Sequence, residues 1–178
     1  LPSAYCQGRA APALRVSGMG VWIDTDMGFD DIVAILVVQH AGIPIDGVSL
    51  VFGNALLPQV VSNADGAASA FGWDIPIWRG RARPVLGEPL TAGYVLGASG
   101  IPTAGSSFAE APDVTREGAF EAFCRWLEAA GLPKRVLALG PVTILAALAL
   151  ARPDLASRID EVIWVGDSLT SGNHTASA

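Results

Sequence analysis

The sequence predicts an α/β fold with an open, mainly parallel, Rossmann-like sheet flanked by helices. Short runs of apolar, strand-forming residues alternate along the chain with helical runs, which is typical of βαβ units. The composition is 51% hydrophobic and only 16% charged, as expected when helices cover both faces of a sheet. The 178 residues are enough for one domain with a substantial core.

The predicted strands are short, apolar and bounded by turn residues. They cover residues 21–23, 48–52, 74–78, 135–140 and 161–166. Pro76 lies in the third of these segments, and proline cannot donate a hydrogen bond to a neighbouring strand. We therefore expect the third strand at an edge of the sheet, or Pro76 at the end of the strand.

The predicted helices follow the strands. They cover residues 32–40, 58–70, a run from about residue 115 to Gly131, and 142–151. The first helix is apolar nearly all round, so we expect it to be buried. The third carries Phe120, Phe123 and Leu127 on one face. Residues 79–112 are rich in Gly, Pro, Ala and Ser, and so long an irregular segment predicts a lid or binding loop.

The first 18 residues are expected to be a leader or disordered extension, and residues 19–178 the α/β domain. Residues 1–18 contain no sustained apolar segment of the kind found in a secretion signal, so we expect a cytoplasmic protein. Cys6 and Cys124 form no CxxC pair, which favours a stray terminal thiol and a small core residue.

The charge balance limits the classes of partner. A net charge of -6 without a basic stripe argues against nucleic acid, whose phosphates require Lys and Arg. No uninterrupted apolar run reaches the ~18 residues of a membrane-spanning helix. Cations and neutral polar small molecules are the partners that this composition favours.

Four carboxylates, Asp24, Asp26, Asp30 and Asp31, lie between the first predicted strand and the first predicted helix. Like charges ~5 Å apart repel by roughly 3 kcal/mol at an effective dielectric constant of ~20. Protons, helix-terminus amides or a metal ion must compensate for this repulsion. Ligands of open α/β sheets bind at the carboxyl ends of the strands, where this cluster lies. The cluster is therefore our candidate ion and substrate site.

Helix capping explains Asp30 or Asp31 but not Asp24 and Asp26 as well. No His or Cys lies nearby, so the available ligands are hard oxygens, which suit Ca²⁺ or Mg²⁺ better than zinc. An EF-hand loop is excluded, because Ile35 occupies the position of its bidentate Glu.

A Mg²⁺-dependent phosphoaspartyl phosphatase is the competing enzyme class, because that family also has Asp-x-Asp after its first strand. Such enzymes usually have Thr or Val two residues after the second Asp, where this chain has Gly28. They also lack an Asp-Asp pair at the start of the next helix. This alternative would require a phosphoenzyme on Asp24.

The string "DTDMGFDD", residues 24–31, resembles the N-terminal signature of the inosine/uridine-preferring nucleoside hydrolases, Asp-x-Asp-x-Gly-x-Asp-Asp after the first strand. Two further segments resemble the same family in the right order. "VFGNALLPQVVSNA", residues 51–64, is similar to its second strand ending in Gly-Asn. Residues 137–173 are similar to its Leu-Gly-Pro-Leu-Thr-Asn segment, the following strand and a Gly-Asn loop. The resemblance runs from Val21 to the last residue.

The resemblance implies Ca²⁺-dependent hydrolysis of the N-glycosidic bond of ribonucleosides, giving ribose and a free base, as in purine and pyrimidine salvage. Asp26, Asp31 and the backbone carbonyl of Leu139 would bind the ion. The ion would hold the attacking water and lower its pKa, so that Asp26 acts as general base.

The resemblance also implies the substrate contacts. Asp30 and Asn54 would hydrogen-bond the ribose hydroxyls, Asn173 would hold the far side of the ribose, and Asp24 would support the cluster. From the residues alone, Asn54 after Gly53 could be a turn residue, although its place at the end of a strand favours a function, and Asn173 is an ordinary loop signal. Family members commonly form dimers or tetramers, so a homo-oligomer is implied.

Several positions depart from the family pattern. Met27 stands where Pro is usual, and Leu96 where the lid carries His. Ile144 stands where Asn follows Thr, and Asp167 replaces the second Gly of a Gly-Gly pair. Purine or pyrimidine preference is therefore not predicted.

Family members are longer, and the sequence ends at Ala178, where they continue with a Glu-Phe-Asn stretch and a last Ca²⁺-binding Asp. We therefore expect a fold that lacks its C-terminal part and exposes an unfinished sheet edge and apolar helix faces. The alternative to an active hydrolase is a truncated or degenerate homologue that is inactive or only binds metal or nucleoside.

Overall fold

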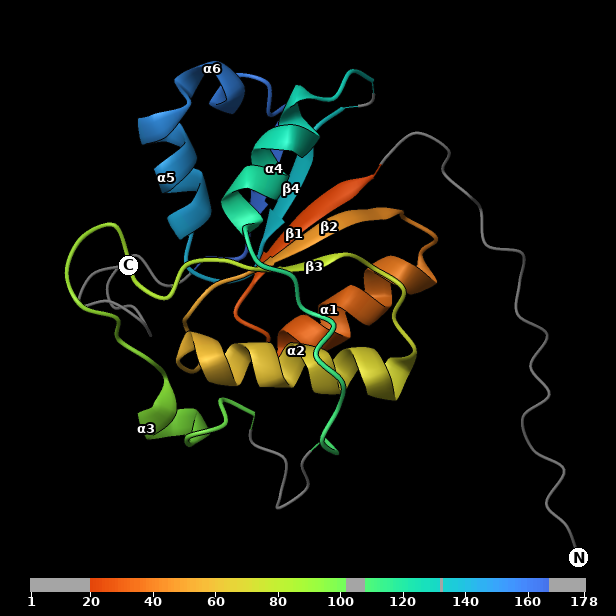
Figure 1. Cartoon of the computed structure of the whole chain (residues 1–178), viewed down its shortest axis with the longest axis vertical. Helices are drawn as coiled ribbons and strands as arrows, with labels where there is room; N and C mark the ends of the chain where they lie inside the picture. Colours follow the sequence, from red (N-terminus) through yellow and green to blue (C-terminus); the bar gives the residue numbers. More distant parts are fainter. Residues whose placement is uncertain (1–19, 102–107, 132, 167–178) are drawn as a thin grey trace, which may run out of the picture.

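The computed structural model describes residues 20–101, 108–131 and 133–166, which contain one five-stranded parallel sheet with helices on both faces (Figure 1). The strands are β1 (Val21–Thr25), β2 (Ile45–Leu50), β3 (Ile77–Arg79), β4 (Arg135–Ala138) and β5 (Glu161–Trp164). Their order across the sheet is β3-β2-β1-β4-β5, and every pair is parallel. The predicted open parallel α/β fold is confirmed.

All five predicted strands are present, with shifted ends. β2 begins at Ile45, three residues before the predicted start, because Ile45 and Gly47 pair with Val21 and Trp22 of β1, with Asp46 at a shift in the register between them. A side chain at Gly47 would collide with the rings of Trp22 and Trp78, so the missing side chain makes room for two indoles. β3 begins directly after Pro76 and is an edge strand of the described sheet, as predicted.

Six helices are described: α1 (Phe29–His40), α2 (Leu57–Phe71), α3 (Gly93–Leu96), α4 (Ala119–Glu128), α5 (Thr143–Ala151) and α6 (Pro153–Ala156). Figure 1 shows α1 and α2 on one side of the sheet, and α4, α5 and α6 on the other. The helices α3 and α6 were not predicted, because four residues are too few to show helical periodicity. None of the helices in the described part of the chain combines the length and hydropathy that a membrane crossing requires.

The prediction that the first helix begins at Ile32 is wrong, and the expectation that it is buried holds for one side only. The helix α1 begins at Phe29, and Val33 and Val37 are 52% and 60% exposed. It packs one side, including Ile32 and Ile35, against the sheet. Its outer side has apolar residues but no cover from another described element.

The strand β5 forms the other edge of the described sheet, and all four of its residues are exposed. Three of them, Val162, Ile163 and Trp164, are large and apolar. The exposed strand β5 matches the expectation of an exposed sheet edge. The outer side of α1 matches the expectation of exposed apolar helix residues.

The core has two parts, one on each side of the sheet. Ile23, Val48 and Leu50 belong to the part covered by α1 and α2. On the other side Trp22 packs at centroid distances of 5.1 Å from Phe123 and 5.5 Å from Trp126, both on α4. Trp22 also stacks on Trp78 of β3, at 5.2 Å.

The core assignments on α4 are largely confirmed. Phe123 and Leu127 are fully buried, and Phe120 packs at the margin of the same cluster. Cys124 is a buried free thiol, as predicted, whereas Cys6 lies outside the described residues.

The chain order creates a crevice beside β1. From β1 the chain proceeds to β2 and β3 on one side, then crosses to β4 and β5 on the other. In parallel sheets the carboxyl ends of the strands on either side of such a reversal are the usual place for a ligand. β1 and β4 are those strands here, and the acidic cluster follows β1.

The aromatic cluster predicts a stability effect. We expect Phe123→Ala to lower the free energy of unfolding by about 3–5 kcal/mol, because it removes a fully buried ring that contacts Trp22 and Trp126. Urea unfolding followed by tryptophan fluorescence measures this change. Tyr94→Ala is the matched control, since Tyr94 is 76% exposed, and should change stability by less than about 0.5 kcal/mol. Equal effects of the two variants would contradict the observed packing.

Candidate active site

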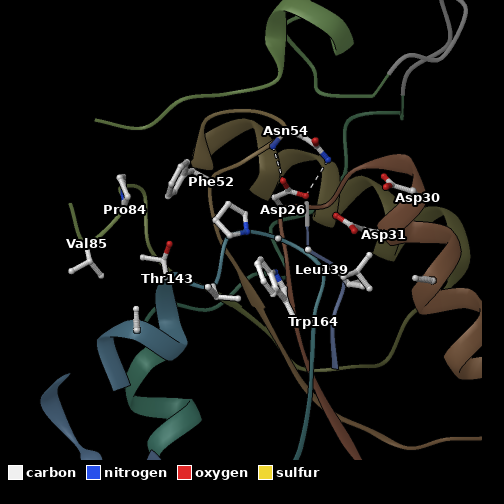
Figure 2. Close-up of a pocket in the computed structure, with 17 residues that line it drawn as sticks. Asp26, Asp30, Asp31, Phe52, Asn54, Pro84, Val85, Leu139, Thr143 and Trp164 are labelled. Carbon is white, nitrogen blue, oxygen red and sulfur yellow. Dashed lines mark hydrogen bonds between the residues drawn. The ribbon is translucent and has the colours of Figure 1, made fainter. Parts of the chain in front are cut away.

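A cavity of about 660 Å³ lies at the carboxyl ends of the central strands (Figure 2). Its acidic lining comes from Asp26, Asp30 and Asp31, and the rest of its lining from α1, from the segments after β2, β3 and β4, and from the end of β5. The residues labelled in Figure 2 are Asp26, Asp30, Asp31, Phe52, Asn54, Pro84, Val85, Leu139, Thr143 and Trp164. Five of the seven residues predicted for the site line this cavity.

Asp26 and Asp31 are the buried acids of the cavity. Asp26 follows β1 and is 2% exposed, whereas Asp31 lies in the first turn of α1 and is 5% exposed. The Asp31 Oδ2 atom accepts a hydrogen bond of 2.9 Å from the backbone N–H of Gly28. Asp31 therefore caps α1 and also faces Asp26. Its position is consistent both with helix capping and with a role in the predicted ion site. Asp30, one residue earlier, is exposed and lies at the cavity.

Two donors of Asn54 hold the Asp26 carboxylate. The Asn54 backbone N–H donates to Oδ2 at 2.7 Å, and the Asn54 Nδ2 donates to Oδ1 at 3.0 Å. The sequence predicted Asn54 at the site but did not predict this contact with Asp26. The preceding Gly53 permits it, because a Cβ atom there would come within 2.7 Å of Asp26 Cγ.

The electrostatics of the pair follow from burial. Burial, together with hydrogen bonding to Asp31 and the charge of Asp31, raises the pKa of Asp26 far above its ordinary value. Burial likewise raises the pKa of Asp31, although hydrogen bonds from Asp26 and the Gly28 backbone oppose this. Two adjacent buried carboxyl groups require either a shared proton or a cation.

Asp24 lies behind the cavity rather than in its lining. Its side chain is 0% exposed, and its Oδ1 accepts a hydrogen bond of 2.5 Å from the Ser49 hydroxyl of β2. Burial raises the pKa of Asp24 to about 7, against the opposing effect of the Ser49 hydrogen bond. A phosphoryl acceptor must be reached by its substrate, so this burial contradicts the phosphatase alternative, in which Asp24 is the nucleophile.

Leu139 follows β4 and lines the cavity beneath Asp26 and Asp31 (Figure 2). Its backbone N–H donates to the Asp24 carbonyl at 2.8 Å, which extends the pairing of β4 with β1 by one residue. The sequence predicted that Leu139 would join the two acids, and the parallel pairing of β1 and β4 brings it there.

The donor set fits a hard cation. Within the described residues, no three side chains of His, Cys, Asp or Glu are arranged to hold a metal ion. The predicted set requires only two such side chains, Asp26 and Asp31, with the carbonyl of Leu139. The two buried acids supply negative charge when they are ionised, and all three residues offer oxygen, the ligand that Ca²⁺ and Mg²⁺ prefer.

The apolar lining contains residues that the sequence did not single out. Phe52 follows β2, and Trp164 ends β5, so both lie at carboxyl ends of strands, which is the signal that could have identified them. Pro84 and Val85 come from the segment predicted to be a lid or binding loop, and they do line the cavity. Asn173, predicted to contact ribose, lies outside the described residues.

Met27 adopts a left-handed backbone conformation, with φ of 53°. Proline, which is usual at this position in the family that the sequence resembles, is restricted to φ near −65° and could not adopt it. The Met27 side chain is fully buried, and its backbone N–H donates to Thr25 Oγ1 at 2.9 Å. These contacts offset the strain of the turn between Asp26 and α1.

Comparison with known proteins assigns the family. The family model described as inosine-uridine preferring nucleoside hydrolase matches residues 21–178. The chain therefore belongs to the inosine-uridine preferring nucleoside hydrolase family.

Individual relatives match most of this chain. A non-specific ribonucleoside hydrolase RihC of Salmonella paratyphi B is 30% identical over 164 residues, which are 91% of this chain and 53% of that protein. An uncharacterized protein of Schizosaccharomyces pombe is 32% identical over 163 residues, which are 89% of this chain and 48% of that protein. The solved structure of an inosine-guanosine nucleoside hydrolase matches with a TM-score of 0.75 and 28% identity, over 90% of this chain and 53% of that one. The chain thus spans about half the length of these relatives.

The close approach of Gly53 to Asp26 is testable. We expect Gly53→Ala to lower the free energy of unfolding by about 1–3 kcal/mol, because the added methyl would push Asp26 away from the Asn54 donors. Thermal and urea unfolding measure the change. Gly93→Ala in α3 is the control: its Cβ would have no neighbour closer than 3.6 Å, and its stability should stay within about 0.5 kcal/mol of wild type. An unchanged Gly53→Ala protein would argue against the observed position of Asp26.

Proposed function

We propose that this chain carries the cation-binding and general-base part of a ribonucleoside hydrolase, with Asp26 as the general base. The observation that carries this proposal is the buried Asp26–Asp31 pair at the carboxyl ends of β1 and β4, in a chain of the nucleoside hydrolase family. The matching relatives named for ribonucleoside hydrolysis support N-glycosidic bond cleavage as the reaction.

The cavity has separate regions for the two parts of a nucleoside. Asp30 and Asn54 supply polar groups near Asp26, where ribose hydroxyls would hydrogen-bond. Pro84, Val85 and Trp164 supply apolar surface, which suits the flat faces of a nucleobase. This division supports a ribonucleoside as substrate without selecting purine or pyrimidine.

The proposed cation is Ca²⁺, held by Asp26, Asp31 and the carbonyl of Leu139. When bound, a divalent cation stabilises the ionised form of both carboxylates and lowers the pKa of water. Ca²⁺ is favoured over zinc because all three residues offer oxygen.

The proposed chemistry of Asp26 is proton transfer. A water oxygen forms a bond to the ribose C1′ atom as the C1′–N bond breaks, and the water proton passes to the Asp26 carboxylate. The departing base takes up a proton in turn. The two hydrogen bonds from Asn54 hold both oxygens of Asp26. The Asp26 carboxylate, the proposed general base, is therefore fixed in one rotamer.

The activity test is release of free base from inosine and uridine, measured by chromatography. We expect Asp26→Asn to slow release by about 10²–10⁴-fold, the usual contribution of a general base. Asp74→Asn is the charge-matched control, since Asp74 is exposed and outside the cavity, and should retain wild-type activity. A folded wild-type chain that releases no base would overturn hydrolysis and favour the binding-only alternative.

The cation test is thermal unfolding in chelator and in Ca²⁺. At 100 times its Kd, Ca²⁺ should stabilise the wild type by about 2.7 kcal/mol, a Tm rise of about 5–10 °C. Asp31→Asn should lose most of this rise, because it removes one of the two buried carboxylates. A wild-type Tm that is the same in chelator and in Ca²⁺ would contradict the proposed cation.

A further inference from the structure

A buried asparagine of α2, which the proposed mechanism does not use, ties this helix to the turn at residues 99–101. Asn63 is 5% exposed, and its Nδ2 donates to the Ser99 carbonyl at 2.9 Å. Its Oδ1 accepts a hydrogen bond of 3.0 Å from Gln59 Nε2, one helical turn earlier. Both ends of the buried amide are therefore paired, and the donor from Gln59 leaves the Asn63 nitrogen to face the turn.

The turn that Asn63 holds is closed by short-range hydrogen bonds of its own. The Ser99 hydroxyl donates to the Ile101 carbonyl at 3.1 Å and accepts from the Ile101 backbone N–H at 3.3 Å. The Gly100 N–H donates to the Gly97 carbonyl at 3.2 Å, and the Gly100 φ of 67° lies in the left-handed region that favours glycine. Ile101 is 7% exposed and belongs to the core part covered by α1 and α2. The bond from Asn63 therefore fixes a compact unit and not only one carbonyl.

The turn packs directly on the loop that carries Asn54. A Cβ atom at Gly100 would lie 3.0 Å from the Asn54 carbonyl carbon and 3.1 Å from Asn54 Cβ, so the absent side chain permits this close approach. The same segment contacts the loop at a second point, because the Ala92 N–H donates to the Gly53 carbonyl at 3.2 Å. On its other side Asn54 lies against the start of α1, where a side chain at Gly28 would collide with Asn54 Nδ2. Asn54 is thus enclosed between the turn and α1.

We propose that Asn63 is a positioning residue, which holds the turn at residues 99–101 against Asn54 and so keeps both Asn54 donors on Asp26. This inference rests on the proposed function, since it requires Asp26 to be the general base. Asn63 lies outside the cavity lining, so its effect on the reaction passes through the turn and Asn54. A displacement of about 1 Å, caused far from the reacting atoms, costs a reaction on the order of 10²-fold in rate.

The first test is hydrogen exchange of the Asn54 backbone N–H, measured by NMR, because this group donates to Asp26 Oδ2. We expect Asn63→Ala to raise its exchange rate about tenfold relative to the slowest amides of the sheet, which report global unfolding. Asp65→Ala is the matched control, because it removes another buried anchor from α2, one that holds Val114 and Thr115 instead of the turn. Its Asn54 exchange rate, on the same relative scale, should stay within about twofold of wild type.

A second variant tests the same contact from the turn, and it decides the question if Asn63→Ala does not fold. Gly100→Ala keeps Asn63 but adds a methyl group that would push the turn away from Asn54. Gly72→Ala is its control, because Gly72 has a similar φ of 64° and a Cβ atom there would meet nothing within 4 Å. Both variants carry comparable backbone strain, so only Gly100→Ala should raise the relative Asn54 exchange rate and slow base release.

Base release from inosine provides a readout that a purely structural role would not change. We expect Asn63→Ala to lower kcat about tenfold, because Asp26 spends less time in its productive orientation, whereas Asp65→Ala should keep the wild-type kcat. In an Asn54→Ala background, Asn63→Ala should cause a much smaller further loss, since the amide through which it acts is gone.

The outcomes separate this inference from the proposed function. If Asn63→Ala and Asp65→Ala change Asn54 exchange and kcat equally, or if the Asn63 and Asn54 effects on kcat multiply in full, the inference is overturned while the proposed function stands. If the folded wild-type chain releases no base, the proposed function and this inference both fail.

Discussion

The burial of Asp26 against Asp31 is the constraint on which the rest of the site depends. Two carboxyl groups in contact and almost without solvent are unfavourable as a doubly charged pair, and burial is the main cause of their raised pKa. Neighbouring features reduce the cost, including the N-terminus of α1, two donors of Asn54 and the backbone N–H of Gly28. These donors are all neutral, so the pair still requires a shared proton or a cation to balance its charge.

The sheet topology brings the parts of this site together. Asp26 follows β1, Asn54 follows β2 and Leu139 follows β4, and these three strands are adjacent and parallel. Residues separated by more than a hundred positions in the chain therefore meet at one edge of the sheet. Gly53 allows the loop after β2 to approach closely enough for Asn54 to reach Asp26. The cavity results from three strand ends, with β5 adding Trp164.

Much of this arrangement could be predicted from the sequence. The density of acids at residues 24–31 placed the site, and the alternation of strands and helices predicted the parallel sheet that brings Leu139 to it. The Asn54–Asp26 bonds could not be predicted, because they depend on the path of the loop after β2 and not on residue type. The burial of Asp24 behind the site could not be predicted either. All four acids are aspartates, so residue type does not show which of them faces the cavity.

The errors have a common physical cause. The apolar residues of α1 predicted a fully buried helix, yet Val33 and Val37 are exposed. Whether a side chain is buried depends on which other elements pack against its helix. The apolar pattern of the sequence shows only which side chains are suited to burial. β5 shows the same difference, with an apolar run whose four residues are all exposed.

The most direct test is an X-ray structure of crystals grown with Ca²⁺, in which anomalous scattering locates the ion. The account predicts a peak about 2.3–2.6 Å from a carboxylate oxygen of Asp26, one of Asp31 and the carbonyl oxygen of Leu139. An ordered site without an ion, or an ion bound elsewhere on the molecule, would contradict it.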